Sequence, residues 1–274
     1  MYSIVNEMEK LHGKVAVITG SASGMGAAMA KCFAAQGMKV AVSDIKDEKG
    51  KTVVKEILDN GGEAFYMHCD VRIENDVKAM VKETVKRYGK LHCMVNNAGI
   101  TCASHPLHEL TTADLEDIMG TNFNGVFFGM KYGIEAMLET KSNKENCTVI
   151  NISSGCGFSS TAGLTFYNTS KHAVNAITKS AALEYPRHGI TVNAINPGVF
   201  ATSIFDGVPE EQMAIYREMC PNGRFGRPEE IAWLALFLSS DMARQINGSC
   251  ISIDAGKMAG DFIPTNWKNP NIGK

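Results

Sequence analysis

Short apolar runs rich in β-branched residues alternate with longer amphipathic segments along nearly the whole chain. Near-continuous apolar strands joined by helices pack as a parallel sheet covered by helices on both faces. The alternation therefore predicts an α/β fold with a doubly wound parallel sheet. Strands are expected at 14–19, 39–44, 63–70, 91–99, 147–153, 189–198 and 249–256, and helices at 24–37, 49–62, 73–89, about 112–139, in the run that follows 165, and at 228–240.

The chain is expected to form one domain, residues 1–274, because no linker, repeat or low-complexity segment divides it. One segment, about 199–227, interrupts the alternation and is predicted to be a substrate lid. The tail, 257–274, is loop-like, and whether it covers its own active site or a neighbour's stays open.

Charge and composition exclude several classes of function. A net charge of −2 gives no reason to expect a nucleic acid or an anionic membrane as partner. No apolar stretch has the length of a transmembrane helix, and the N-terminus lacks the apolar region of a signal peptide. The eight cysteines are scattered without zinc-site spacing. We expect a cytoplasmic protein with reduced cysteines and no metal.

The first predicted strand runs directly into TGSASGMG (19–26) and then into a helix. Glycines permit the tight bend and let the backbone approach a pyrophosphate, and the helix N-terminus supplies free N–H groups. The spacing is GxxxGxG rather than GxGxxG, but the strand before and the helix after indicate a dinucleotide-binding turn.

Asp44 ends the second predicted strand, eighteen residues beyond Gly26. A carboxylate there can accept hydrogen bonds from the adenosine ribose and repels a 2′-phosphate, which predicts NAD rather than NADP. Lys46 is a nearby cation that opposes this preference. The alternative for Asp44 is a helix N-cap or a solvated turn.

Tyr167 and Lys171 are four residues apart and share a face if the segment is helical. A cation beside a phenol favours the phenolate, which makes tyrosine usable for proton transfer near neutral pH. The spacing alone is weak evidence, because such pairs are common on ordinary helices.

In combination, the motifs resemble those of the short-chain dehydrogenase/reductase family, over roughly Gly13 to Gly256. The resemblance implies a Rossmann-type fold, a dimer or, more typically, a tetramer, and hydride transfer between a nicotinamide and an alcohol or carbonyl. It rests on TGSASGMG at 19–26, NNAG at 96–99, Asn122, Ser154, YNTSK at 167–171, and NPG at 196–198 followed by Thr202.

The resemblance also implies roles for individual residues. Tyr167 would exchange the hydroxyl proton, and Ser154 would hydrogen-bond the substrate oxygen. Lys171 would lower the tyrosine pKa and hold the nicotinamide ribose, while Asn122 would anchor a water in a proton relay. Strand alternation points Ser153 away from this site. The cofactor contacts implied are Gly20, Ser23, Gly24, Met25, Gly26, Asp44, Asp70, Val71, Asn97, Gly99, Tyr167, Lys171, Val199 and Thr202.

Some of these residues have structural alternatives. Asp70 could form a turn, Asn97 and Gly99 could form the turn at a strand exit, and Thr202 could cap a helix. For Asp70 the structural role is nearly as plausible as adenine contact.

The predicted lid is apolar and contains methionines, which suits a sizeable hydrophobic substrate. By resemblance to family members with such lids, we expect a hydroxysteroid dehydrogenase of steroid metabolism, with a bile acid as substrate. The lid's apolar residues could equally pack on the protein itself. Alternative substrates are a small secondary alcohol, a sugar alcohol or a 3-oxoacyl thioester, and the non-enzyme alternative is a nicotinamide-sensing binding protein.

Overall fold

The computed structural model describes residues 11–140, 145–202 and 207–260. Part of the predicted lid, 203–206, and most of the predicted tail, 261–274, lie outside the described residues. Within them, no helix is both long and apolar enough to cross a membrane.

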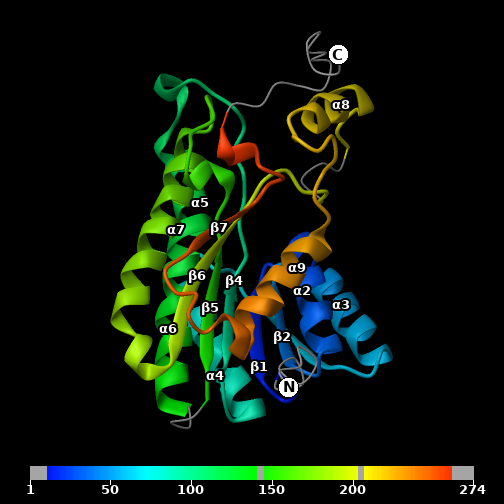
Figure 1. The fold of residues 1–274 in the computed structure, drawn as a ribbon, viewed down its shortest axis with the longest axis vertical. Helices are drawn as coiled ribbons and strands as arrows, with labels where there is room; N and C mark the ends of the chain where they lie inside the picture. Colours follow the sequence, from blue (N-terminus) through cyan, green and yellow to red (C-terminus); the bar gives the residue numbers. More distant parts are fainter. Residues whose placement is uncertain (1–10, 141–144, 203–206, 261–274) are drawn as a thin grey trace, which may run out of the picture.

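Seven parallel strands form one sheet in the order β3-β2-β1-β4-β5-β6-β7, which confirms the predicted fold class (Figure 1). The chain builds outward from β1 to β3 and then crosses back to β4 on the other side of β1. Ligands of such sheets bind beyond the carboxyl ends of the strands at this reversal. The strands are β1 Val15–Thr19, β2 Lys39–Asp44, β3 Glu63–His68, β4 Cys93–Asn96, β5 Cys147–Ile152, β6 Ile190–Pro197 and β7 Cys250–Ile253.

Helices cover both faces of the sheet and bury its alternating side chains. On β1, Ala16 and Ile18 join the core under α2, α3 and α9, whereas Val15 and Val17 join the core under α4, α6 and α7. The helices are α2 Gly24–Ala35, α3 Asp47–Asp59, α4 Glu74–Tyr88, α5 Thr112–Met119, α6 Gly125–Thr140, α7 Thr165–Glu184, α8 Glu210–Glu218 and α9 Pro228–Ser239.

Two elements differ from the sequence prediction. The helix expected at about 112–139 is divided by a π-helical segment, Gly120–Asn124, which carries Asn122. The predicted lid contains a helix, α8, beyond the carboxyl ends of the strands (Figure 1). A π-helical turn shifts the phase of the following helix, so periodicity read from sequence does not reveal it.

Candidate active site

A groove of about 670 Å³ follows the carboxyl ends of the central strands, where the strand order reverses. It begins at Asp44, passes the glycine loop and reaches Tyr167 and Lys171. All the predicted cofactor contacts line it except Val199. These residues come from six separate segments that meet along one groove: 20–26, 44, 70–71, 97–99, 167–171 and 202. Its lining also includes residues that motif spacing does not single out, among them Ile45, Arg72, Ile100, Thr101, Asp117 and Thr121.

The backbone conformation and the close packing of the glycine loop both require glycine. Gly20 and Gly24 have φ values of 64° and 54°, the left-handed region that glycine adopts without strain. A Cβ on Gly26 would lie 2.3 Å from the carbonyl oxygen of Gly20. Ser23 precedes α2 without a side-chain capping bond, which leaves the N–H groups of the first turn for an anion. The loop therefore fits a pyrophosphate.

Asp44 binds the protein's own backbone at this end of the groove. Its two carboxylate oxygens accept hydrogen bonds from the N–H groups of Ala22 and Lys46, both at 3.0 Å. It does not cap α3, whose N-cap is Lys46. Because a carboxylate oxygen has two acceptor positions, Asp44 can hold the glycine loop and still accept bonds from a ribose.

Asp70 and Asn97 also make structural contacts. Asp70 accepts hydrogen bonds from the backbone N–H of Arg72, at 3.0 Å, and from its guanidinium, which lowers the pKa of the carboxyl. Asn97 donates to the carbonyls of Thr19 and Gly20. Both residues therefore play the structural part that the sequence left open, while still facing the groove.

Asn122 is fully buried and joins three segments. Its amide oxygen accepts from the N–H of Ile100 at 2.8 Å, and its Nδ2 donates to the Ile100 carbonyl at 2.9 Å and to Ser170 Oγ at 3.2 Å. Both donors of the amide are thereby used. A water in a relay would need the amide oxygen or the backbone of the π-helical segment.

Tyr167, Lys171 and Ser154 meet at the other end of the groove. Lys171 is buried, with its Nζ over the Tyr167 ring at 5.7 Å from the ring centroid, and it donates to the Ile152 carbonyl at 3.0 Å. Ser154 hydrogen-bonds the phenol. Ser153 donates from its hydroxyl to the Lys171 carbonyl, and the residues that line the groove include Ser153 but not Ser154.

Burial dominates the ionisation of both groups. It raises the pKa of Tyr167, which the Ser154 hydrogen bond opposes, and it lowers the pKa of Lys171 to about 8. The expectation that Lys171 would bring the tyrosine pKa down is not what this arrangement gives. The ammonium lies over the ring and bonds a backbone carbonyl, and the group that favours the phenolate here is Ser154. A raised pKa keeps the phenol protonated, the form that can donate to a carbonyl.

Val199 and Thr202 begin the predicted lid. The Val199 carbonyl accepts from the N–H of Gly226, and its side chain does not line the groove. Thr202 does line the groove, where a Cβ on Gly24 would lie 3.4 Å from the threonine side chain. The beginning of the lid is therefore in reach of the glycine loop.

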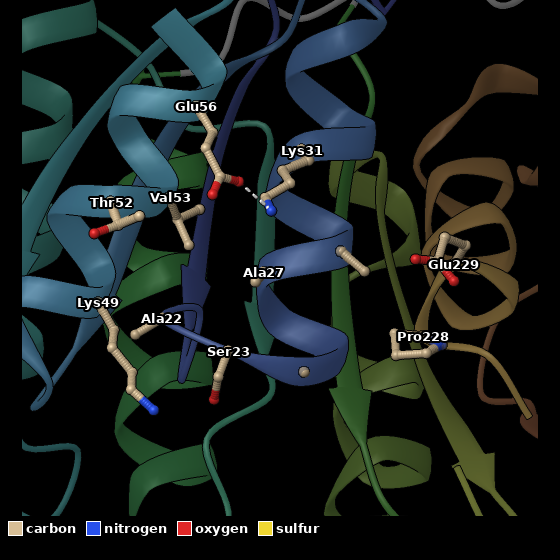
Figure 2. A pocket seen from close by; sticks show the side chains of 12 residues that line it. Ala22, Ser23, Ala27, Lys31, Lys49, Thr52, Val53, Glu56, Pro228 and Glu229 are labelled. Carbon is tan, nitrogen blue, oxygen red and sulfur yellow. Dashed lines mark ion pairs between the residues drawn. The ribbon is translucent and has the colours of Figure 1, made fainter. Parts of the chain in front are cut away.

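A second hollow of about 400 Å³ adjoins the glycine loop between α2, α3 and α9. Figure 2 shows the ion pair of Lys31 and Glu56 across it, with Lys49 and Ser23 pointing toward its lower end. Its charges balance, with Glu229 as the second acid, and its lining includes neither Tyr167 nor Lys171. The chemistry therefore belongs to the groove.

No group of three or more His, Cys, Asp or Glu side chains that could hold a metal occurs in the parts of the chain that the structure describes. None of the eight cysteines, all of which lie in the described ranges, forms a disulfide.

Comparisons with known proteins agree with this geometry. A family model described as enoyl-(acyl carrier protein) reductase matches residues 20–257. A 2,5-dichloro-2,5-cyclohexadiene-1,4-diol dehydrogenase from Sphingobium indicum is 37% identical over 252 residues, which cover 91% of this chain and 98% of that protein. A cyclohexanol dehydrogenase from an Acinetobacter species is 36% identical over 245 residues, covering 89% and 95%.

Among solved structures, a 3-ketoacyl-(acyl-carrier-protein) reductase from Brucella melitensis in complex with NADH has a TM-score of 0.84 to this chain. It is 32% identical, and the match covers 90% of this chain and 99% of that one.

Proposed function

Because the chain belongs to the short-chain dehydrogenase/reductase family and is an oxidoreductase acting on a CH–OH group, we propose that it is an NAD(H)-dependent dehydrogenase of hydrophobic cyclic secondary alcohols. The observation that carries the proposal is the single groove that joins Asp44, the glycine loop and the Tyr167–Lys171 pair.

Three side chains would move the proton at the reacting carbon. Tyr167 would donate its phenolic proton to a carbonyl oxygen, or accept the hydroxyl proton in the reverse direction. Ser154 accepts a hydrogen bond from the Cys156 N–H at 3.1 Å, which orients its own O–H for the phenol or the substrate oxygen. A bound nicotinamide supplies or takes up the hydride.

Lys171 would hold the nicotinamide ribose and connect the tyrosine to solvent. One of its three N–H donors binds the Ile152 carbonyl, so the ammonium is fixed in place and two donors remain in the groove wall. Asn122 would anchor a water near the lysine. The remaining predicted cofactor contacts, Val199 included, are part of the same proposal.

NAD is favoured over NADP by the position of Asp44. Its carboxylate faces the groove and would repel a 2′-phosphate. The solved relative from Brucella melitensis is complexed with NADH, which supports the same choice. Lys46 lines the groove and opposes it. Kinetics with both cofactors decide between them.

A cyclic alcohol is supported by the names of the relatives and by exposed apolar residues in the predicted lid. Both curated relatives are named for alcohols on six-membered carbon rings. In the described part of the lid, Ile215 and Met219 on and beside α8 are exposed, whereas Phe200 packs in the core. The lid thus keeps apolar side chains for a ligand as well as for packing. A hydroxysteroid, and among these a bile acid, is the larger substrate of this class that we propose.

A 3-oxoacyl thioester is the second candidate, and the solved reductase from Brucella melitensis favours it. It differs from the first in substrate shape, since an acyl chain is linear and a steroid is a fused ring. The same assay separates the two.

We further propose a homo-oligomer, a tetramer rather than a dimer, in a cytoplasmic compartment. Phe127 and Leu138 on α6 and Leu183 on α7 are exposed apolar side chains on two long helices that share one face of the sheet. The absence of a disulfide among the eight cysteines, all of them in the described ranges, suits a reducing compartment. Light scattering after size-exclusion chromatography measures the assembly.

The deciding experiment follows NADH absorbance with purified protein, NAD or NADP, and a panel of substrates. The panel contains cyclohexanol, hydroxysteroids, bile acids, a sugar alcohol and a 3-oxoacyl thioester. We expect turnover of ring alcohols with NAD and none in the Tyr167→Phe variant. Turnover of the sugar alcohol or the thioester without any ring alcohol would contradict the proposal.

A further inference from the structure

The connection between β5 and α7 carries Ser154 at its start and leads into the helix of Tyr167 at its end. A shift of this loop, residues 153–164, would move the serine hydroxyl relative to the phenol. The loop also forms the surface next to both groups. What holds it therefore matters for catalysis and for substrate fit.

Asn175 holds the first half of the loop. This buried residue of α7 donates from Nδ2 to the Gly157 carbonyl at 3.0 Å and accepts at Oδ1 from Asn196 Nδ2 at 3.2 Å. Asn196, on β6, donates in turn to the Ser154 carbonyl at 2.7 Å. The backbone from the Ser154 carbonyl to the Gly157 carbonyl is thus tied to α7 and to β6.

The loop backbone at Gly157 packs too closely against its neighbours to accommodate a Cβ atom. A Cβ on Gly157 would lie 2.6 Å from Asn175 Nδ2, 2.7 Å from Ser153 Oγ and 2.9 Å from the Lys171 carbonyl oxygen. The loop backbone therefore lies directly against the helix that carries the tyrosine and the lysine.

Asn168 holds the second half of the loop. It precedes Asn175 by seven residues, two helical turns, and so lies on the same face of α7. It is buried, and its amide donates to the Thr161 carbonyl at 2.8 Å and accepts from the Thr161 N–H at 3.3 Å. Two residues on, the Gly163 carbonyl accepts from the His105 N–H at 3.1 Å.

His105 belongs to the segment after β4, which lines the groove at Ile100 and Thr101. Through Gly163, the contact of Asn168 with Thr161 is thus linked to the segment after β4. We call the space between that segment and the 153–164 loop the substrate mouth, and its width would then be set from α7.

We propose that Asn168 and Asn175 are positioning residues that hold the 153–164 loop along α7. Asn175, with Asn196, keeps Ser154 in reach of Tyr167, and Asn168 sets the width of the substrate mouth. The kinetic part of this inference rests on the proposed function. Neutral amides suit the task because each contact needs a donor and an acceptor in one buried, uncharged side chain.

The part of the proposal that concerns Asn175 predicts a slower chemical step. Below we call it the Asn175 arm, and the part that concerns Asn168 the Asn168 arm. In Asn175→Leu, which removes both hydrogen bonds, we expect kcat to fall about 10- to 100-fold through misplacement of Ser154, while KM for NAD stays within about twofold. Asn175→Ser is smaller and serves the same test if the leucine variant does not fold.

The matched control for Asn175 is Asn193→Leu. Asn193 is likewise buried and binds loop backbone twice, to the Ile246 carbonyl at 2.7 Å and from the Ser249 N–H at 3.0 Å, away from Ser154. We expect it to lower thermal stability without the loss in kcat. An equal loss of kcat in both variants, or none in Asn175→Ser, would overturn this arm.

The Asn168 arm predicts a change in specificity. In Asn168→Ala we expect KM for the larger ring alcohol to rise about tenfold relative to KM for a small secondary alcohol, because the mouth loses its fixed width. Thr169→Ala is the control, since Thr169 is exposed and bonds only the Thr165 carbonyl of its own helix. Equal changes for both alcohols would speak against the inference.

A readout without substrate separates the two proposals. Hydrogen exchange of the peptide covering 155–163 should speed up in Asn168→Ala and in Asn175→Ser but not in Thr169→Ala. If the protein turns over no ring alcohol, the proposed function fails, yet faster exchange still supports the hold on the loop. Unchanged exchange in both asparagine variants would rule out that hold whatever the substrate is.

Discussion

The two ends of the groove differ in which part of the protein forms them: main-chain groups at one end and side chains at the other. At the end proposed to bind adenosine, called the adenosine end below, the glycine loop offers backbone N–H groups, and the side chains of Asp44 and Asn97 hold that backbone in place. At the end proposed to carry out the reaction, called the reaction end below, the proposed chemistry rests on side chains, with Lys171 buried and bonded to one carbonyl. The first end is a shape made by the main chain, and the second is a set of ionisable groups held in an unfavourable environment.

This difference has an energetic consequence. Backbone turns made by glycine sit in conformations that suit them, so the adenosine end adds little strain. Burying an ammonium opposes folding, because the charged form prefers water. The buried ammonium at the reaction end therefore lowers the free energy of unfolding, whereas the glycine turns at the adenosine end do not. Four substitutions test the comparison.

Tyr167→Phe should have the largest effect, because it removes the group that carries the proton. We expect kcat to fall about 10²- to 10⁴-fold, with NADH affinity nearly unchanged. Steady-state rates and NADH fluorescence titration measure the two quantities. Tyr132→Phe is the control and should retain its rate. The Tyr132 hydroxyl donates to Glu74 of α4 at 2.8 Å. Loss of NADH affinity in the first variant would show that the two ends are not separable.

Lys171→Met should inactivate the enzyme and stabilise its fold. Burial lowers the lysine pKa from 10.5 to about 8, so below pH 8 the folded protein keeps a charge that the unfolded chain would expose. This difference opposes folding by on the order of 3 kcal/mol at pH 7. The sign follows because the unfolded state binds more protons between the two pKa values.

The measurement is urea unfolding of both proteins without cofactor as a function of pH. We expect the advantage of Lys171→Met over the native chain to be largest below pH 8, to shrink as pH rises, and to vanish above about pH 10.5. A variant that is less stable than the native chain at pH 7 would show that the Ile152 hydrogen bond outweighs the cost of burial.

Gly26→Ala tests the end made by the main chain. The added Cβ would lie 2.3 Å from the Gly20 carbonyl oxygen, so the loop must shift away from the pyrophosphate. We expect NADH affinity to fall about 10- to 100-fold, as for one or two lost hydrogen bonds to a charged group. Gly120→Ala, where the nearest atom would lie 3.6 Å away, is the control. Unchanged affinity would mean that main-chain shape is not what this end provides.

Asp44→Ala should have the smallest effect, and it should change both the affinity for NAD and the preference for NAD over NADP. It leaves the Ala22 and Lys46 N–H groups without their acceptor and removes the repulsion of a 2′-phosphate. We expect NAD affinity to fall about tenfold and the preference over NADP to narrow. Steady-state kinetics with NAD and with NADP measure both changes. Asp59→Ala, at the exposed end of α3, is the control variant. A variant that keeps its NAD preference would remove Asp44 from the ribose site.

Local sequence was enough for the elements and for the adenosine end. The alternation of apolar runs predicted the seven strands and their parallel sheet, because burial on both faces imposes that pattern. The glycines of 19–26 predicted the turn, since their conformations belong to the residues themselves. Asp44 ends β2 and lines the groove, and its contact with the ribose stays a prediction.

Only the tertiary structure decided how the reaction end is held together. The π-helical segment that carries Asn122, the raised pKa of Tyr167, and the contacts of Asn168 and Asn175 with the 153–164 loop are features of the folded chain that motif spacing does not reveal. Motif spacing can name Ser154, Tyr167 and Lys171 as a set, but not their ionisation. Burial and hydrogen bonding set a pKa, and both exist only once the chain has folded around the groups.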